Sequence, residues 1–325
     1  MLNKWYYINS ETFQELEELL NRVQNKKDLL DSKRPLSPAV LNRVREGLYL
    51  EWNHHSNAIE GNTLSLNETR LVLEEGITIG GKTLKEHLEV IGHQDAINFV
   101  EQLVKPDYKL NAKDILDVHF IVMKKIDEFI AGRYRNAGVR INGANFIPPS
   151  ATKVDAYMDE MIDYISNNPD NLPVIYLAAL FHHRFVWIHP FFDGNGRVAR
   201  LIMNLILMSA GYPPAIILKQ DRKKYYSALD MANNGDYKKF FQLILQAVER
   251  SLDIYLNSTP GYDTYEPISE IVSEPEVPYN AEYISLLARR GKIDAYKEGK
   301  EWYTSKRAIE EYIRNRKRER VLKQR

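Results

Sequence analysis

A short loop between two apolar stretches collects the residue types of a phosphate site. Residues 188–197 read Ile-His-Pro-Phe-Phe-Asp-Gly-Asn-Gly-Arg. Glycines let the backbone approach a phosphate closely, and the start of a helix offers unpaired N–H groups and the positive end of its dipole. His189 adds an imidazole, which titrates near neutral pH and can take up a proton. The loop therefore indicates an anion site with a general base beside it.

The helix expected after this loop carries a polar stripe on one face. Arg197, Arg200 and Asn204 recur at intervals of three and four residues, and apolar residues occupy most other positions. Two arginines on a mostly buried helix need an anionic partner, because burying an unpaired charge is costly. The loop and the stripe together indicate one polyphosphate site.

At these residues the chain resembles the Fic family, whose signature is His-Pro-Phe-x-(Asp/Glu)-Gly-Asn-Gly-Arg with a second arginine three residues on. Every informative position of that signature is present. The resemblance implies a mainly helical fold, the Fic bundle with a β-hairpin flap. It also implies a protein adenylyltransferase, an enzyme that moves AMP from ATP to a Ser, Thr or Tyr hydroxyl of a target protein.

The resemblance assigns a role to each polar group of the loop. His189 would take the proton from the target hydroxyl. Asp193 would hold Mg2+ against the α- and β-phosphates, because a hard cation prefers oxygen ligands. Asn195 and the backbone N–H groups of Gly194 and Gly196 would stabilise charge that develops at the α-phosphate. Attack at the α-phosphate would then expel diphosphate.

The two arginines and an upstream motif form the next expectation. Arg197 would hold the β-phosphate and Arg200 the γ-phosphate. Residues 56–61 read Ser-Asn-Ala-Ile-Glu-Gly and resemble the family's inhibitory motif, (Ser/Thr)-x-x-x-Glu-(Gly/Asn), placed N-terminal to the catalytic domain as in the second of three inhibition classes. The motif makes Ser56 and Glu60 the inhibitory residues.

Inhibition would work by occupancy of the nucleotide site. The carboxylate of Glu60 would pair with Arg200, neutralise it and repel the γ-phosphate, so that ATP binds only in an unproductive pose. The alternative is that residues 56–61 are simply the end of a helix, with Gly61 just beyond it.

A hairpin signal interrupts the otherwise helical pattern. Asn142-Gly143 lies between Val139 and Ile147. Asn-Gly between two stretches in which apolar and polar residues alternate is typical of the two-residue loop of a β-hairpin. In the Fic family the matching element is the flap, whose edge would pair with the main chain of the target protein. A surface hairpin without a partner is the alternative.

Downstream residues resemble the family's adenine and ribose contacts. Tyr226 and Asn233 are the candidates, because an aromatic ring and an asparagine serve these contacts in the family. The alternative is nearly as strong, since tyrosines on an amphipathic helix usually belong to the core or its rim.

Composition limits the partners and the compartment. The chain has 325 residues, with 44 basic and 44 acidic side chains, so no global field attracts nucleic acid or an anionic membrane. The absence of cysteine excludes disulfides and thiolate metal sites. We find no apolar leader and no apolar span that would cross a bilayer, and we expect a cytoplasmic protein with no membrane partner.

The pattern along the chain predicts four regions. Residues 1–110 form a helical region with the inhibitory helix, residues 111–255 the Fic catalytic domain, residues 256–278 a proline-rich linker, and residues 279–325 a small module with a basic tail. Apolar spacing predicts helices over 12–30, 39–56, 66–75, 84–104, 111–130, 154–166 and 173–188.

The C-terminal module resembles the winged helix-turn-helix of excisionase-type and MerR-type DNA-binding proteins. DNA is therefore one partner to expect through residues 280–325, and target recognition or formation of a homo-oligomer is the alternative role.

Two other functions compete with AMP transfer. The same site could remove AMP from a target, with Glu60 positioning water. The chain could also be a DNA-binding regulator that senses a nucleotide, although such a sensor has no use for the base His189.

Overall fold

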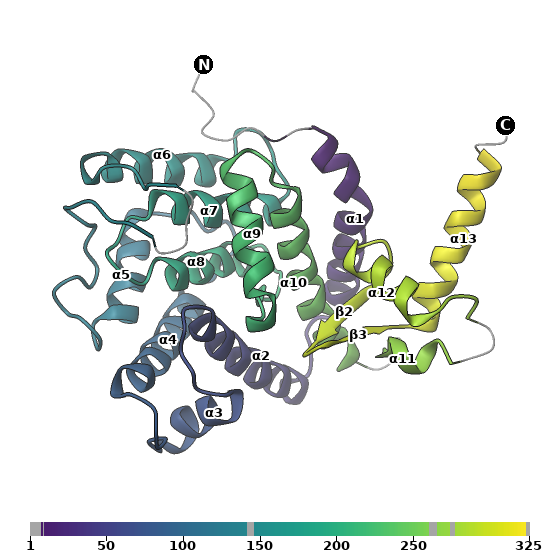
Figure 1. Ribbon diagram of the computed structural model, residues 1–325, viewed down its shortest axis with the longest axis horizontal. Coiled ribbons are helices and arrows are strands. Elements are labelled where there is room, and N and C mark those ends of the chain that lie inside the picture. Colours follow the sequence, from purple (N-terminus) through teal and green to yellow (C-terminus); the bar gives the residue numbers. More distant parts are fainter. Residues whose placement is uncertain (1–7, 9, 142–145, 260–264, 274–276, 323–325) are drawn as a thin grey trace. The chain divides into compact units, whose positions relative to one another are not determined.

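The computed structural model describes residues 8, 10–141, 146–259, 265–273 and 277–322 (Figure 1). Within those residues the chain is built almost wholly from helices, and its strands form one small sheet in the C-terminal part. This confirms the mainly helical fold class. None of the described helices is both long and apolar enough to traverse a lipid bilayer.

The chain folds into two compact units that do not follow the order of the sequence. The larger contains residues 45–244, and the smaller combines residues 10–44 with the described residues from 245 onward. The helical region expected over 1–110 is therefore divided between the two units. The reason is that Arg22 and Lys26 bind acidic side chains 227 positions later in the sequence, a relation that no local pattern reveals.

The larger unit is a bundle of helices, and the predicted helices within it are present. They are the part of α2 (Pro38–Ile59) from Arg45 onward, α3 (Leu66–Glu75), α4 (Leu84–Leu103), α5 (Ala112–Met123), α6 (Val154–Asn167), α7 (Val174–Ile188), α8 (Asn195–Ser209), α9 (Arg222–Asn233) and the first part of α10 (Lys238–Asn257). Two short 3-10 turns, Ala151–Lys153 and Lys219–Asp221, precede α6 and α9.

One predicted boundary in this unit is wrong. The helix expected to extend to residue 130 ends as α5 at Met123. A turn follows, in which the N–H group of Ile126 donates to the Met123 carbonyl and that of Phe129 donates to the side chain of Asp127 (3.0 Å). An aspartate that bonds nearby backbone N–H groups offers an alternative to the helix, which explains the early end.

The centre of the larger unit is the packed pair α7 and α8 (Figure 1). Helix α6 packs against α7, and α4 and α5 pack against α8. All residues of α8 from 197 to 207 are buried. In its polar stripe, Asn204 is satisfied because its side chain bonds both main-chain groups of Ala215 (2.8 and 3.1 Å). The two arginines of the stripe must find their partners elsewhere.

The smaller unit joins an N-terminal helix to the C-terminal elements. It contains α1 (Ser10–Ser32), β1 (Glu266–Pro267), α11 (Ile268–Ile271), α12 (Ala281–Arg289), β2 (Ala295–Glu298), β3 (Glu301–Thr304) and α13 (Lys306–Leu322). The strands form an antiparallel sheet in the order β1-β3-β2, with Tyr296 opposite Tyr303. The helix, turn and hairpin predicted beyond residue 279 are present, and Ser305 caps α13 by accepting the Ala308 N–H (3.2 Å).

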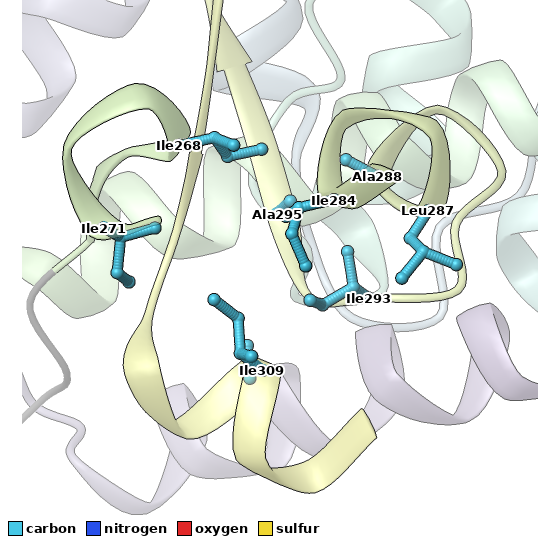
Figure 2. Close-up of a cluster of buried hydrophobic side chains, with 9 residues drawn as sticks. Ile268, Ile271, Ile284, Leu287, Ala288, Ile293, Ala295 and Ile309 are labelled. Carbon is cyan, nitrogen blue, oxygen red and sulfur yellow. The ribbon is translucent and has the colours of Figure 1, made fainter. Parts of the chain in front are cut away.

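The segment 256–278, expected to be a linker, contains β1 and α11. Glu266 pairs with Thr304 of β3, and Ile268 and Ile271 are buried in a core with side chains from α12, the hairpin and α13 (Figure 2). Two apolar residues among prolines show no periodicity, so the sequence gives no sign of this packing. The small core depends on them.

A cluster of buried charges fastens α1 to α10 within the smaller unit. Arg22 makes two bonds to Glu249 (2.5 and 2.9 Å), and Lys26 pairs with Asp253 (2.7 Å) and with Asp294 before β2. Two cations thus face three carboxylates. Burial raises the pKa of Asp253 to about 8, against the opposing effect of Lys26. The cluster explains why α1 belongs with the C-terminal elements.

Four buried histidines of the larger unit make its stability depend on pH. Burial lowers the pKa of His119 and of His183 to about 4, and it lowers the pKa of His93 and His182 well below the ordinary value. The unfolded chain therefore binds more protons than the folded chain between about pH 4 and 6.5, so the free energy of unfolding falls as pH falls.

We expect a change from about pH 7 to about pH 5.5 to lower the free energy of unfolding by about 1 kcal/mol for each of these histidines. Urea titrations followed by circular dichroism at both pH values measure the effect. In His183→Gln the pH-dependent part should shrink by about 1 kcal/mol, whatever the absolute stability becomes. An unchanged pH dependence in that variant would contradict the assignment.

Candidate active site

His189 stands at the end of the central helix α7. It is the C-cap residue, with φ 51° and ψ 61°, and its N–H donates to the Phe185 carbonyl (2.9 Å). This left-handed conformation is uncommon for a residue with a side chain and turns the chain sharply into the loop. The ring Nδ1 lies 3.4 Å from the Val186 carbonyl, so Nδ1 carries the proton and Nε2 is left as the acceptor.

Asn195 fixes the shape of the loop. Its side-chain oxygen accepts the Phe191 N–H, and its side-chain NH2 donates to the Phe191 carbonyl, both at 2.9 Å. The expectation was that this side chain stabilises charge at the α-phosphate. Both of its polar atoms bond the Phe191 main chain, so the side chain holds the loop, and the expected role at the α-phosphate stays a prediction. The main-chain N–H groups at the start of α8 are left for an anion.

His119 supports the loop from α5, and sequence reasoning missed it. Its ring is stacked on Phe191 with centroids 3.6 Å apart. Its Nδ1 accepts the Gly132 N–H (2.9 Å), so Nε2 carries the proton and donates to the Asp193 carbonyl (3.1 Å). The one available signal was a histidine within the apolar face of the predicted helix.

Arg135 ties the loop to the chain that enters and leaves the expected flap, and sequence reasoning missed it too. Its N–H donates to the Pro190 carbonyl (2.9 Å). Its guanidinium, which is buried, donates to four further carbonyl oxygens, those of His189 (2.7 Å), Ala137 (2.9 Å), Pro149 (2.6 Å) and Ile188 (3.3 Å). The planar guanidinium holds its N–H donors in a fixed geometry that suits several acceptors at once. The side chain therefore connects the main chain at His189 with the main chain on either side of the expected flap.

The loop encloses a polar hollow of about 150 Å3. Its lining contains His189, the loop residues Phe192, Asp193, Gly194, Asn195, Gly196 and Arg197, and Glu60 from the end of α2. The sequence-predicted base, carboxylate, glycines and first arginine are therefore brought together. The lining is mostly polar rather than apolar, which suits a charged ligand.

Arg197 is a buried cation with few partners. Its side chain is 3% exposed, and its Nε and Nη1 have no hydrogen-bond partner within the described residues. The nearest carboxylate oxygens, from Asp193 and Glu89, lie 3.7 and 3.8 Å away. A buried guanidinium with unused donors at the wall of a polar hollow is a ready site for an anion.

Arg200, one turn further along α8, has its partners in place. Its Nη2 bonds Glu60 Oε1 and the Ser56 carbonyl, both at 2.8 Å, and its Nε donates to the Ser56 hydroxyl (3.0 Å). Burial acts against the charged form, but the Glu60 carboxylate together with Tyr225 and Tyr226 outweighs it, so the pKa of Arg200 is raised. The pair of Glu60 and Arg200 expected from the motif is present.

Gly196 makes room for the Glu60 carboxylate. A Cβ atom added at Gly196 would collide with Glu60 Oε1 and stand 3.1 Å from Arg200 Nη1. The same residue lines the hollow. The absence of a side chain here therefore admits either the Glu60 carboxylate or a phosphate at the start of α8.

The turn after α2 holds Glu60 in position. Gly61 has φ 108°, a conformation that favours glycine. Asn62 donates to the Glu86 carbonyl (2.9 Å) and to Glu89 Oε2 (3.0 Å), and the Thr63 N–H and hydroxyl donate to the Glu86 carboxylate (2.9 and 2.6 Å). These bonds tie the turn to α4, so the position of Glu60 is determined from both sides.

The expected adenine and ribose residues differ in their surroundings. The side-chain oxygen of the half-buried Asn233 lies 2.9 Å from His183 Nε2, and its expected contact with the nucleoside stays a prediction. Tyr226 is 38% exposed, and its ring centroid lies 5.0 Å from the Arg222 guanidinium, whose Nε donates to the carbonyl of Ile59 (2.7 Å), the residue before Glu60. Its neighbour Tyr225, missed from sequence, reaches Arg200 Nη1 (3.5 Å).

The turn of the expected hairpin, residues 142–145, lies outside the described residues. The described residues on either side, 138–141 and 146–149, have no strand. Ile147 is 75% exposed. The hairpin and its pairing with a target main chain stay predictions.

Comparison with known proteins identifies the family. A model described as Fic/DOC family matches residues 109–207. The chain is 39% identical over 248 residues to Protein adenylyltransferase Fic of Nematostella vectensis and 39% identical over 281 residues to the protein of that name from Aedes aegypti, which covers 76% and 86% of this chain. It spans 57% and 55% of those relatives, little more than half their length.

Solved structures agree with the sequence relatives. Fic-1 from C. elegans has a TM-score of 0.69 at 33% identity, with 74% of this chain and 72% of that chain covered. A Fic domain containing signaling protein from Bacteroides thetaiotaomicron has a TM-score of 0.67 at 30% identity, with 74% and 96% covered. The chain belongs to the Fic/DOC family.

We expect Arg135→Met to lower the free energy of unfolding by about 2–4 kcal/mol, because it leaves several inward-facing carbonyl groups without a donor. Urea titration of the full chain measures the change. Arg140→Met is the matched control, since Arg140 is exposed in the same segment, and a surface change of this kind is expected to cost less than about 0.5 kcal/mol. Equal effects of the two substitutions would contradict the bracing role.

Proposed function

We propose that this chain is a protein adenylyltransferase that transfers AMP from ATP to a hydroxyl side chain of a target protein. One observation carries the proposal: the acceptor nitrogen of a histidine and the unused donors of a buried arginine belong to a single polar hollow at the start of a helix. The relatives named above carry the activity in their names, which supports the same conclusion.

The nucleotide would lie along the start of α8. Arg197 has unused donors and would bind the β-phosphate, and Arg200, freed from Glu60, would bind the γ-phosphate. The α-phosphate would then meet the N–H groups at the helix start, where the helix dipole favours an anion. The Tyr226 ring packs 5.1 Å from that of Tyr225, which bonds Arg200 Nη1, and Tyr226 is the candidate contact for the nucleoside.

The reaction is an exchange of one phosphorus–oxygen bond for another. The target hydroxyl oxygen attacks the α-phosphorus, and the bond from that phosphorus to the oxygen bridging to the β-phosphate breaks. Nε2 of His189 takes the hydroxyl proton, and diphosphate leaves with the bonding electron pair. Donors at the helix start stabilise the charge on the α-phosphate oxygens as the bond forms.

The residues fit a magnesium ion that arrives with the nucleotide. The Asp193 side chain is 51% exposed at the hollow, and one of its oxygens accepts the Gly194 N–H (2.6 Å), which leaves the other for a metal. Magnesium commonly binds one or two carboxylates plus phosphate oxygens, so one aspartate is sufficient. When bound, the ion would neutralise phosphate charge and favour departure of diphosphate.

Glu60 would keep this activity low. Its carboxylate occupies the guanidinium assigned to the γ-phosphate and carries charge of the same sign. ATP must displace it or bind in another pose. Replacing Glu60 would free the Arg200 guanidinium and leave His189 and the loop unchanged.

We expect Glu60→Gly to increase ATP-dependent labelling of protein by roughly tenfold or more, since it removes a carboxylate that competes directly with the γ-phosphate for Arg200, and tenfold corresponds to only about 1.4 kcal/mol. His189→Ala in that background should lower labelling to background, because a general base contributes roughly 100-fold or more. The assay is incubation with Mg2+ and ATP labelled at the α-phosphate. Glu75→Gly, at the exposed end of α3, is the control and should behave as the wild type.

Equal labelling in all these variants would refute both role assignments.

Removal of AMP is the second candidate function, favoured by the position of Glu60 in the same hollow as His189, where its carboxylate could orient water. If the chain releases AMP from an AMP-modified protein and Glu60→Gly abolishes that release, removal is the activity.

We expect the His189 ring to stay neutral near neutral pH, which is the form that can accept a proton. Burial, aided by Arg135, lowers the pKa of His189 to about 4, and the Val186 carbonyl, Glu60 and Asp193 act in the opposite direction. Because the neutral ring is the active form, activity would be lost only as pH falls towards that value.

We expect kcat/KM of the Glu60→Gly variant to change less than about twofold between about pH 8 and about pH 6. A histidine with the ordinary pKa of about 6.5 would give a loss of roughly fourfold over that range. Initial rates of labelling at each pH, with circular dichroism to confirm folding, decide between the two. A midpoint near 6.5 would contradict the shifted pKa.

A further inference from the structure

A second hollow lies on the outer side of the turn that follows α5. It measures about 560 Å3 and is lined by Phe120, Lys124, Lys125, Glu128, Phe129 and Arg133. We refer to these six residues as the α5 groove. The groove belongs wholly to the larger unit and shares no lining residue with the catalytic hollow.

Two aromatic rings of the groove are turned towards water. Phe129 is 80% exposed and Phe120 is 46% exposed. Removing such a ring from water stabilises a complex, and exposed apolar residues gathered in a hollow mark interaction surfaces. The shape and the rings suit an apolar side chain from a partner.

The groove is positively charged around these rings. Lys125 is neutralised by Asp95 (2.6 Å). Lys124, whose ammonium lies 5.9 Å from the Phe120 ring centroid, and Arg133 have no ion-pair partner within the described part of the chain, and they outnumber Glu128. A partner segment with carboxylates on either side of an apolar residue would complement this surface.

The groove is linked to the catalytic loop through short contacts. Phe120 follows His119, which bonds the Asp193 carbonyl and the Gly132 N–H. Arg133 precedes Arg135 by two residues, roughly 7 Å of chain, and Arg135 bonds the His189 carbonyl and both ends of the flap segment. A segment bound in the groove would therefore lie within reach of the place where a target hydroxyl must enter.

We propose that the α5 groove docks the target protein through an acidic segment that carries an exposed aromatic or aliphatic side chain. The proposal rests on the proposed function, since it assigns part of target selection to a surface outside the catalytic hollow. Docking at a second surface supplies affinity that a short contact with the flap lacks, and it raises the effective concentration of the hydroxyl at the site.

The test uses two fluorescein-labelled peptides and the full chain. One carries a single phenylalanine flanked by aspartate and glutamate, and the other replaces those residues with lysine and arginine. Fluorescence anisotropy should show that the acidic peptide binds at least tenfold more tightly than the basic one. Phe129→Asp and Lys124→Glu should each weaken its binding by tenfold or more, and Leu84→Asp, a control at a 72% exposed residue that begins α4, should not.

Several outcomes would overturn the proposal. Equal binding of the two peptides, or acidic-peptide binding that survives both groove substitutions, would do so. If the groove instead joins two copies of the chain, Phe129→Asp would change the oligomeric state in sedimentation while leaving peptide binding unchanged.

Labelling with ATP, measured on the same variants in the Glu60→Gly background, separates this inference from the proposed function. The groove substitutions should leave self-labelling within about twofold. Peptide binding without any labelling would defeat the proposed function alone, and labelling without selective peptide binding would defeat the docking groove alone.

Discussion

A guanidinium removed from water controls the resting state of the larger unit. Arg200 lies on a helix that is buried along most of its length, and a charge in that position needs a carboxylate or a phosphate beside it at all times. Glu60 supplies the carboxylate at 2.8 Å, and Ser56 supplies two further acceptors from the same helix α2. Under the proposed function, a triphosphate would therefore exchange its last phosphate for the Glu60 carboxylate at Arg200 and would not fill a vacant site.

The two arginines of α8 differ in how far their donors are engaged. Arg200 is paired with Glu60 and Ser56, whereas Arg197 has donors without partners in the described residues. Under the proposed function, a nucleoside diphosphate would satisfy Arg197 without disturbing Glu60, but a triphosphate would place its last phosphate against that carboxylate. The proposed site would then favour the shorter nucleotide, and the ion pair of Glu60 and Arg200 would oppose the productive pose of ATP.

The sequence identified the groups that do chemistry better than the groups that position them. His189, Asp193, Arg197, Arg200 and Glu60 stand in short motifs, and the structure brings them to one place. His119 and Arg135 act through main-chain groups distant in sequence, so no motif marks them. The packing of β1 and α11 was missed for the same reason, since β3, the strand that pairs with β1, lies more than thirty residues later. DNA binding by residues 280–325 stays a prediction.

Gly196 has an evolutionary consequence. A side chain at this position would displace the Glu60 carboxylate and would also take up space in the polar hollow. Under the proposed function, a lineage that altered Gly196 to escape inhibition would therefore also narrow the place of the phosphate. Constitutive activity should then arise through changes in the segment that carries Glu60, which selection could adjust independently of the loop.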